Sequence, residues 1–304
     1  MSKELIELSN ALAQATERAA GSVVAIHTER RGSSSGVVWR PGVIVTSEHA
    51  LRRDEEIQVT LPDGRVVAAT LAGRDPSTDI AVLKCAEAAS AVPEFSDVAM
   101  LKPGSITLVV GRTRASGPVA ALGVVSLVAP DRHSWTGLSI VPYIRLDVGL
   151  QPTAVGGAVI DAHDATVGMA TPRFARFGAI AVPAASINKI ADTLLQKGHI
   201  PRGFLGVGLQ PVRLPEALRE KLQWNEKAAV IVMDVHTGGS ADKAGIVIGD
   251  ILISIASQPV TRLEDIQTHL SGDAIGKTLP IKFVRGGTIE EGSILIAERA
   301  QGGE

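Results

Sequence analysis

The stretch GRDPSTDIAVLK, from Gly73 to Lys84, presents a carboxylate, Asp79, at the point where an apolar strand-like run begins. Similar short runs lie on both sides of it, separated by Gly, Pro and Asp. Between Ser22 and Pro183 they include SVVAIHT, SGVVW, GVIVTS, SITLVVG, LGVVSLV, YIRLDV and GAIAVP. Many short strands with turn residues between them are typical of an antiparallel barrel or sandwich. The sequence therefore predicts a mainly β domain around this stretch.

The chain divides into a large β-rich part and a smaller part. Apolar residues recur at helical spacing between Ala184 and Lys197, and Gly198 follows as a helix stop. After a short connector with Gly and Pro, strand-like and helix-like runs predict a small α+β module. The predicted organisation is an amphipathic helix over 1–20, a β domain over 21–198, a linker over 199–203 and the small module over 204–300.

The first twenty residues place Leu5, Leu8 and Leu12 on one helical face, with charged residues opposite. This apolar face can mediate assembly or pack on the β domain of its own chain, and the sequence leaves both open. A secretory signal needs a basic start and an unbroken apolar stretch of about 7–15 residues, which this segment lacks. The sequence therefore predicts a cytoplasmic protein.

Composition excludes several classes of function. The net charge is −2, from 30 basic and 32 acidic residues without a basic run, so no nucleic-acid partner is expected. No run of about 20 apolar residues occurs, so no membrane span is expected. The lone cysteine, Cys85, cannot form an intrachain disulfide, and the seven histidines lack the spacing of metal ligands. We therefore expect no metal and no other cofactor.

Three motifs follow one another in the order histidine, aspartate and nucleophile loop. VIVTSEHAL presents His49, GRDPSTDIAVLK presents Asp79, and DVGLQPTAVGGAVID presents Val155. Together with PRGFLGV and GSADKAGIVIGDILISIASQPV further along, they resemble the HtrA/Deg family of trypsin-like serine peptidases with a carboxy-terminal PDZ domain. The resemblance implies a mainly β fold, in which a trypsin-like double six-stranded β-barrel precedes a small α+β PDZ domain. It also implies trimers that assemble through the peptidase domains.

The nucleophile loop departs from the family pattern. From Gln151 to Ala158 the chain has Gln-Pro-Thr-Ala-Val-Gly-Gly-Ala, where the family has Asn-Pro-Gly-Asn-Ser-Gly-Gly-Pro. Val155 offers no oxygen that a base could deprotonate, and loss of the serine lowers turnover about 10⁶-fold in a serine peptidase. Thr153 replaces the glycine whose backbone freedom shapes the oxyanion hole. We therefore predict that the loop Thr153-Ala154-Val155 adopts a collapsed or flipped arrangement and forms no working oxyanion hole.

His49 and Asp79 remain from the triad and allow two interpretations. They can act as a base and its orienting carboxylate for a nucleophile supplied by a partner or ligand. They can also form a structural hydrogen bond that ties two strands together, which is the interpretation we favour. No nearby serine completes the triad, because Ser47 precedes the histidine on its own strand and Ser77 lies too close to Asp79.

The resemblance also indicates a peptide-binding edge in the small domain. PDZ domains bind extended carboxyl-terminal peptides by strand addition, while the backbone N–H groups of a loop hold the terminal carboxylate. Strand addition is expected along the chain from Gly206 to Gln210. The matching carboxylate loop consists of Phe204, Leu205, Gly206 and Val207.

A helix from about Arg262 to Leu270 is expected to form the other wall of this groove. Leu263, Ile266 and Leu270 are the candidates for its side-chain pocket. Ile266 and Leu270 can equally belong to the core of the small domain.

The sequence thus predicts an inactive HtrA-like serine peptidase homologue that acts as a scaffold, regulator or chaperone through its PDZ domain and its barrels. The expected partners are protein carboxyl termini or peptides, and a homo-oligomer such as a trimer, or a hetero-oligomer with a related protein, is expected. One alternative is a serine-type endopeptidase completed by a partner subunit or by an unorthodox nucleophile. Another is a purely structural trimer with a closed PDZ groove.

Overall fold

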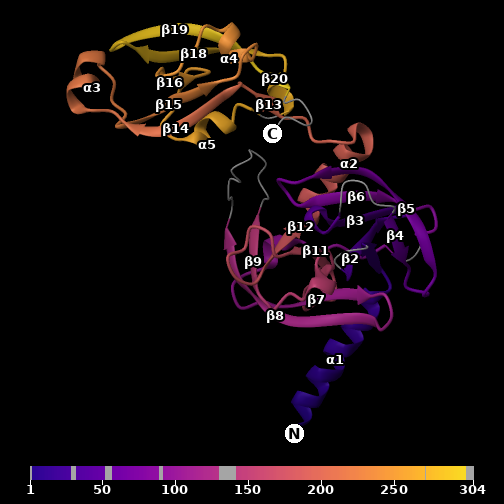
Figure 1. The fold of residues 1–304 in the computed structure, drawn as a ribbon. Coiled ribbons are helices and arrows are strands. Elements are labelled where there is room, and N and C mark those ends of the chain that lie inside the picture. The colour runs from indigo at the N-terminus through magenta and orange to yellow at the C-terminus, as the bar shows by residue number, and fades with distance from the viewer. Residues whose placement is uncertain are drawn as a thin grey trace. The chain divides into compact units, whose positions relative to one another are not determined.

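The computed structural model describes residues 2–28, 32–51, 57–88, 92–129, 142–270 and 272–298. These residues form two compact units, and the boundary between them falls between Ile200 and Pro201. The first unit contains two closed six-stranded barrels, and the second contains a small sheet with short helices (Figure 1). The predicted mainly β fold, a trypsin-like double barrel followed by a PDZ domain, is confirmed.

The first barrel closes in the order β1-β2-β3-β6-β5-β4. Its strands are β1 Val23–Thr28, β2 Gly32–Arg40, β3 Val43–Ser47, β4 Ile57–Thr60, β5 Val66–Asp75 and β6 Ile80–Lys84. Successive side chains of a strand point to opposite faces, and alternate apolar residues such as Val24, Ile26 and Ile44 fill the interior. The pairing of β3 with β6 places Ser47 opposite Ile80, so the two strand ends that carry the histidine and aspartate motifs meet.

The second barrel closes in the order β10-β11-β12-β9-β8-β7. Its strands are β7 Ile106–Thr113, β8 Gly117–Ala129, β9 Tyr143–Asp147, β10 Ala158–Ile160, β11 Thr166–Thr171 and β12 Ala179–Pro183. A second apolar cluster, outside the barrel interiors, joins residues of both barrels with two helices, and it includes Trp39, Met169 and Ile187. This shared core fixes one barrel against the other, which any site built from both barrels requires.

Two helices flank the barrels, α1 Lys3–Ala20 and α2 Ala184–Lys197. Gly198 ends α2 in the left-handed conformation at φ +75, as its sequence predicts. The carboxyl-terminal end of α1 packs on β7 and β8 (Figure 1). The guanidinium of Arg112 donates hydrogen bonds to Ala20 O at 2.7 Å and to Val23 O at 2.6 Å. Burial lowers the pKa of this guanidinium.

The apolar face of α1 is divided between packing and exposure. Ala15 is buried and Leu12 packs on the shared core, whereas Leu5 and Leu8 are 52% and 46% exposed. Part of the predicted face therefore lies on the barrels, and part has no cover within the chain's described residues. Among these residues, no helix is long and apolar enough to cross a membrane.

The second unit is built around a six-stranded sheet in the order β14-β15-β16-β18-β19, with β17 paired to β16. The strands of this sheet are β14 Val207–Arg213, β15 Ala228–Val235, β16 Ile251–Ile255, β17 Gln258–Pro259, β18 Thr278–Arg285 and β19 Thr288–Leu295. Two further strands, β13 Gly203–Phe204 and β20 Ala297–Glu298, form a separate two-stranded sheet. Its helices are α3 Glu216–Leu222, α4 Ser240–Lys243 and α5 Leu263–Gln267. Among the described residues, β14 lies at one end of the strand order and pairs with β15 alone, so its other edge has no strand partner there.

Candidate functional site

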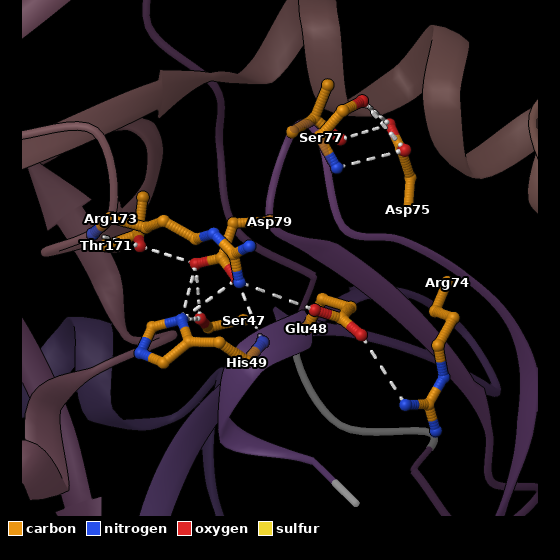
Figure 2. A network of polar contacts seen from close by, with 10 residues as sticks. Ser47, Glu48, His49, Arg74, Asp75, Ser77, Asp79, Thr171 and Arg173 are labelled. Carbon is orange, nitrogen blue, oxygen red and sulfur yellow. Dashed lines mark hydrogen bonds and ion pairs between the residues drawn. The ribbon is translucent and has the colours of Figure 1, made fainter. Parts of the chain in front are cut away.

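The histidine and aspartate motifs meet at one end of the first barrel. β3 ends at Ser47, and the 3-10 turn η1 Glu48–Ala50 then presents His49. Asp79 lies directly before β6 with φ +58, a conformation that aspartate tolerates better than most residues. His49 Nδ1 is 2.9 Å from both carboxylate oxygens of Asp79, and the His49 backbone N–H donates to Oδ1 at 2.9 Å (Figure 2). The fold thus brings together His49 and Asp79, the two triad residues that the motifs predicted.

Asp79 is the centre of a hydrogen-bond network that joins both barrels. The hydroxyls of Ser47, from the first barrel, and Thr171, at the end of β11 in the second, each donate to Oδ2 at 2.5 Å (Figure 2). Burial raises the pKa of Asp79, but the hydrogen bonds from His49, Ser47 and Thr171 outweigh it, so the pKa lies below its usual value. Asp79 is therefore a buried carboxylate that stays ionised at neutral pH.

The ionised carboxylate fixes the state of the imidazole. A neutral histidine that donates Nδ1–H to Asp79 carries its lone pair on Nε2, the arrangement of a general base. The Ser47 hydroxyl contacts Nδ1 at 2.8 Å, so it lies on the wrong side of the ring to act as the nucleophile. Ser77 is engaged with Asp75 through its hydroxyl and its backbone N–H. Neither serine takes the place of the missing hydroxyl.

The nucleophile loop contains the 3-10 turn η3 Pro152–Ala154, and Val155 follows it with φ −63. The backbone N–H of Val155 donates to Pro152 O at 3.3 Å, and the Gly157 N–H donates to Ala154 O at 3.0 Å. Thr153 is not among the residues with positive φ. The N–H group that an oxyanion would need at Val155 is therefore used inside the loop.

Ser35 of β2 holds this loop from the first barrel. Its hydroxyl donates to Thr153 O at 2.6 Å and accepts from the Arg112 N–H at 2.8 Å, while its backbone N–H donates to Val155 O at 2.8 Å. Gly156, at φ +81, lies so close to β3 that a Cβ atom there would be 3.1 Å from Ser47 N. The loop of the second barrel thus reaches the strand end that presents the histidine, and Ser35 of β2 binds two of its carbonyls.

An ion-pair group borders the dyad. Glu48, the residue before His49, is buried and lies 3.5 Å from the guanidinium of Arg74 and 3.7 Å from that of Arg173 (Figure 2). Sequence reasoning missed Glu48, Thr171 and Ser35. Each of them is a polar residue within a strand or next to its end. The sequence could have indicated them, because a polar side chain that is buried at such a position needs a hydrogen-bond partner.

The second candidate site is the open edge of β14. Before it, Gly206 adopts φ +77, which favours glycine. Gly206 O accepts from the His236 N–H at 2.8 Å, and Leu205 O accepts from the Ala241 N–H at 2.9 Å. These two hydrogen bonds hold the loop in place on the domain.

The side-chain pocket beside β14 differs in part from the prediction. Leu205, Val207 and Ile266 line one apolar pocket together with Ile281 and Ile294. Leu205 and Ile266 also belong to the buried core, which was the alternative left open for Ile266.

The helix predicted from about Arg262 to Leu270 is shorter in the structure, where α5 ends at Gln267. Leu270 lies beyond it, and its backbone carbonyl accepts from the Gly203 N–H. Leu270 is not among the residues that line the pocket. Phe204 makes an edge-to-face contact with His236. Within the described ranges, no cluster of three or more His, Cys, Asp or Glu side chains could hold a metal ion.

Comparison with known proteins agrees with this arrangement. Residues 34–169 match the family described as trypsin-like peptidase domain, and residues 203–296 match the PDZ domain family. A probable periplasmic serine endoprotease DegP-like of Bartonella henselae is 30% identical over 255 residues, covering 82% of this chain and 50% of the relative. The chain is an HtrA-type homologue with a trypsin-like domain and a PDZ domain.

Other relatives and solved structures support the HtrA-type assignment. A protein of the same description from Chlamydia pneumoniae is 29% identical over 84% of the chain and 53% of its own length, so this HtrA-type chain spans about half the length of the curated relatives it matches. The serine endoprotease from Yersinia pestis superposes with a TM-score of 0.76 at 26% identity, covering 95% of this chain and 98% of that one. The HtrA-type protease AlgW with decapeptide gives a TM-score of 0.76 at 23% identity, with the same coverage, and shows the shared fold.

The cytoplasmic location predicted from the first twenty residues is wrong. The curated relatives from Bartonella henselae, Chlamydia pneumoniae and Pseudomonas putida are all named periplasmic, which points to an extracytoplasmic location. The prediction failed because it rested on the composition of α1, and that helix is an amphipathic part of the fold that packs on the second barrel.

Proposed function

We propose that this HtrA-type homologue binds peptide carboxyl termini at the β14 edge of its PDZ domain and does not cleave peptide bonds itself. It would then act as a scaffold, regulator or chaperone. One observation carries the proposal: Val155 stands at the nucleophile position, and its N–H is bonded to Pro152 O. The relatives are named serine endoproteases. Under this proposal the chain differs from them in function because its nucleophile loop has no reactive hydroxyl.

The dyad has a structural role under this proposal. Asp79 accepts hydrogen bonds from Ser47 and His49 of the first barrel and from Thr171 of the second. A buried carboxylate without those donors would be strongly unfavourable, so the network stabilises the contact between the barrels whether or not catalysis occurs. This accounts for a histidine and an aspartate that remain in place beside a valine.

Assembly as a homo-oligomer, such as a trimer, or with a related protein, is also proposed. Leu5 and Leu8 lie on α1 with about half of their surface exposed, and an apolar face of this kind is favourable to cover. The double substitution Leu5→Glu and Leu8→Glu is expected to lower the mass measured by light scattering coupled to size exclusion. An unchanged mass above that of the monomer would contradict a role for this face.

The test of the function uses unfolded casein and fluorescent peptides. Purified protein is expected to leave casein intact to the same extent as its His49→Ala variant, and to bind peptides with a free carboxyl terminus but not the amidated peptides. Casein cleavage that His49→Ala abolishes would contradict the proposal.

The intact dyad favours one alternative, an endopeptidase completed by a partner subunit or an unorthodox nucleophile. A fluorophosphonate probe reacts with an activated hydroxyl. Labelling of this chain or of a co-purified subunit would therefore support the alternative, and absence of labelling supports the non-cleaving function.

A further inference from the structure

The open edge of β14 contains a proline, Pro211, and the strand's hydrogen-bonding pattern can be assigned around it. The Leu214 N–H donates to Lys227 O at 2.9 Å, on the β15 side, and Gly206 O accepts from His236 N at 2.8 Å on the same side. In a strand the N–H and C=O of one residue point the same way, and those of its neighbours point the opposite way. The backbone N–H and C=O groups of the even-numbered residues of β14 therefore point toward β15.

The backbone N–H and C=O groups of the odd-numbered residues of β14 point toward the open edge. In the pairing of β14 with β15, Gly208 pairs with Asp234 and the next residue, Leu209, pairs with Val232. The bulge therefore places one extra residue on β15 and none on β14. The alternation along β14 is thus unbroken, and Val207, Leu209 and Pro211 direct their polar groups outward. Pro211 has no N–H, and its ring occupies the direction in which an N–H would point.

We propose that Pro211 limits strand addition to the last four residues of a bound peptide. This inference rests on the proposed function, peptide binding at β14. A carboxylate held beside Gly206 makes the peptide run antiparallel to β14, so its last residue lies near Val207 and its third residue from the end pairs with Leu209. The fifth residue from the end then faces Pro211, and its carbonyl finds no donor.

The consequence is a short recognition segment. At the fifth residue from the end, the peptide carbonyl has no main-chain donor on β14, so the last four residues contribute most of the main-chain hydrogen bonds that select a partner. Val207, half-buried against the apolar core that contains Ile266, lies at the start of β14, where the last side chain of the peptide would be. Ligands of this class are chains with a free carboxylate and an apolar last residue, whatever precedes the last four residues.

The experiment is a length series of acetylated peptides of three to seven residues, which end in valine with alanines before it and compete with a fluorescent peptide. For the full chain we expect affinity to rise from three to four residues and to change less than about twofold from four to seven. In Pro211→Val the restored N–H should make the five- to seven-residue peptides bind about twofold to tenfold more tightly than the four-residue peptide.

Pro280→Val is the matched control, because Pro280 lies on β18, which pairs with β16 and β19 and not with β14. It should keep the length profile of the unmodified protein. A gain above threefold beyond four residues in the unmodified protein would overturn the inference, as would a folded Pro211→Val variant without length dependence. If Pro211→Val does not fold, the series on the unmodified protein decides. Absence of binding at every length would overturn the proposed function, and this inference with it.

Discussion

Restoring the missing hydroxyl should not by itself restore peptidase activity. In Val155→Ser the new hydroxyl would stand at the end of the nucleophile loop. The N–H at position 155 is bonded to Pro152 O, and Ser35 holds the carbonyl of Thr153. The dyad would then face a serine, but no pair of N–H groups would be free to bind an oxyanion. A nucleophile without an oxyanion hole lacks the largest electrostatic contribution to acyl transfer.

The expected deficit follows from the two donors of the hole. Loss of one donor lowers kcat about 10²- to 10³-fold, and the N–H at position 155 is the donor that the structure shows bonded inside the loop. Thr153→Gly, combined with Val155→Ser, lets the backbone adopt positive φ and frees the loop to turn. We expect the double variant to react at least about 100-fold faster than Val155→Ser, because at least one donor becomes available.

The assay is the rate of fluorophosphonate labelling together with casein turnover, each repeated with His49→Ala in the same background. Val155 is buried, so its replacement by serine also costs about 1–3 kcal/mol of stability, and thermal unfolding must show that each variant is folded. If Val155→Ser alone labels within tenfold of the double variant, the reasoning from the loop geometry is refuted.

Three further predictions follow from the same contacts. Asp79→Asn should lower the free energy of unfolding by about 2–3 kcal/mol at neutral pH. Because the folded pKa of Asp79 is depressed, this difference should hold above about pH 4 and shrink as pH falls through the folded pKa; a difference in urea midpoints that grows on acidification would contradict it. Gly206→Ala forces alanine to φ +77 and should weaken peptide binding at least about fivefold, whereas Gly276→Ala, which imposes a similar strain at φ +82 just before β18, should not; equal losses in the two variants would contradict a role for the loop at Gly206. Arg112→Met removes hydrogen bonds to two carbonyls near the end of α1 and should lower stability by about 2–4 kcal/mol, with faster amide exchange in α1; unchanged exchange would show that other contacts hold the helix.

Much of the fold could be predicted because its signals are local. Short apolar runs and turn residues predicted the barrels, and the motifs around His49 and Asp79 predicted which strand ends meet. The helical spacing before Gly198 predicted α2 and its end. The loop before β14 was matched from a few residues and lies beside the edge strand of the described sheet, and its role in binding a carboxylate stays a prediction.

Other features could not be predicted, because they depend on contacts between distant segments. Leu263 and Leu270 fit a longer helix by spacing, but α5 ends at Gln267 and Leu270 takes part in a contact with Gly203 instead. The location was predicted wrongly because amphipathic composition alone cannot tell how a helix is used.

The sequence by itself determined the chemical inventory: a valine with no reactive oxygen, an intact histidine and aspartate, and a proline in an edge strand. Only the tertiary structure decided what these residues face. It placed Thr171 of one barrel on the carboxylate of the other, closed the N–H of Val155 onto Pro152, and turned the missing donor of Pro211 toward the open edge. The physical reason is that side-chain identity is a local property, whereas hydrogen-bond partners are set by barrel closure and strand register across the chain.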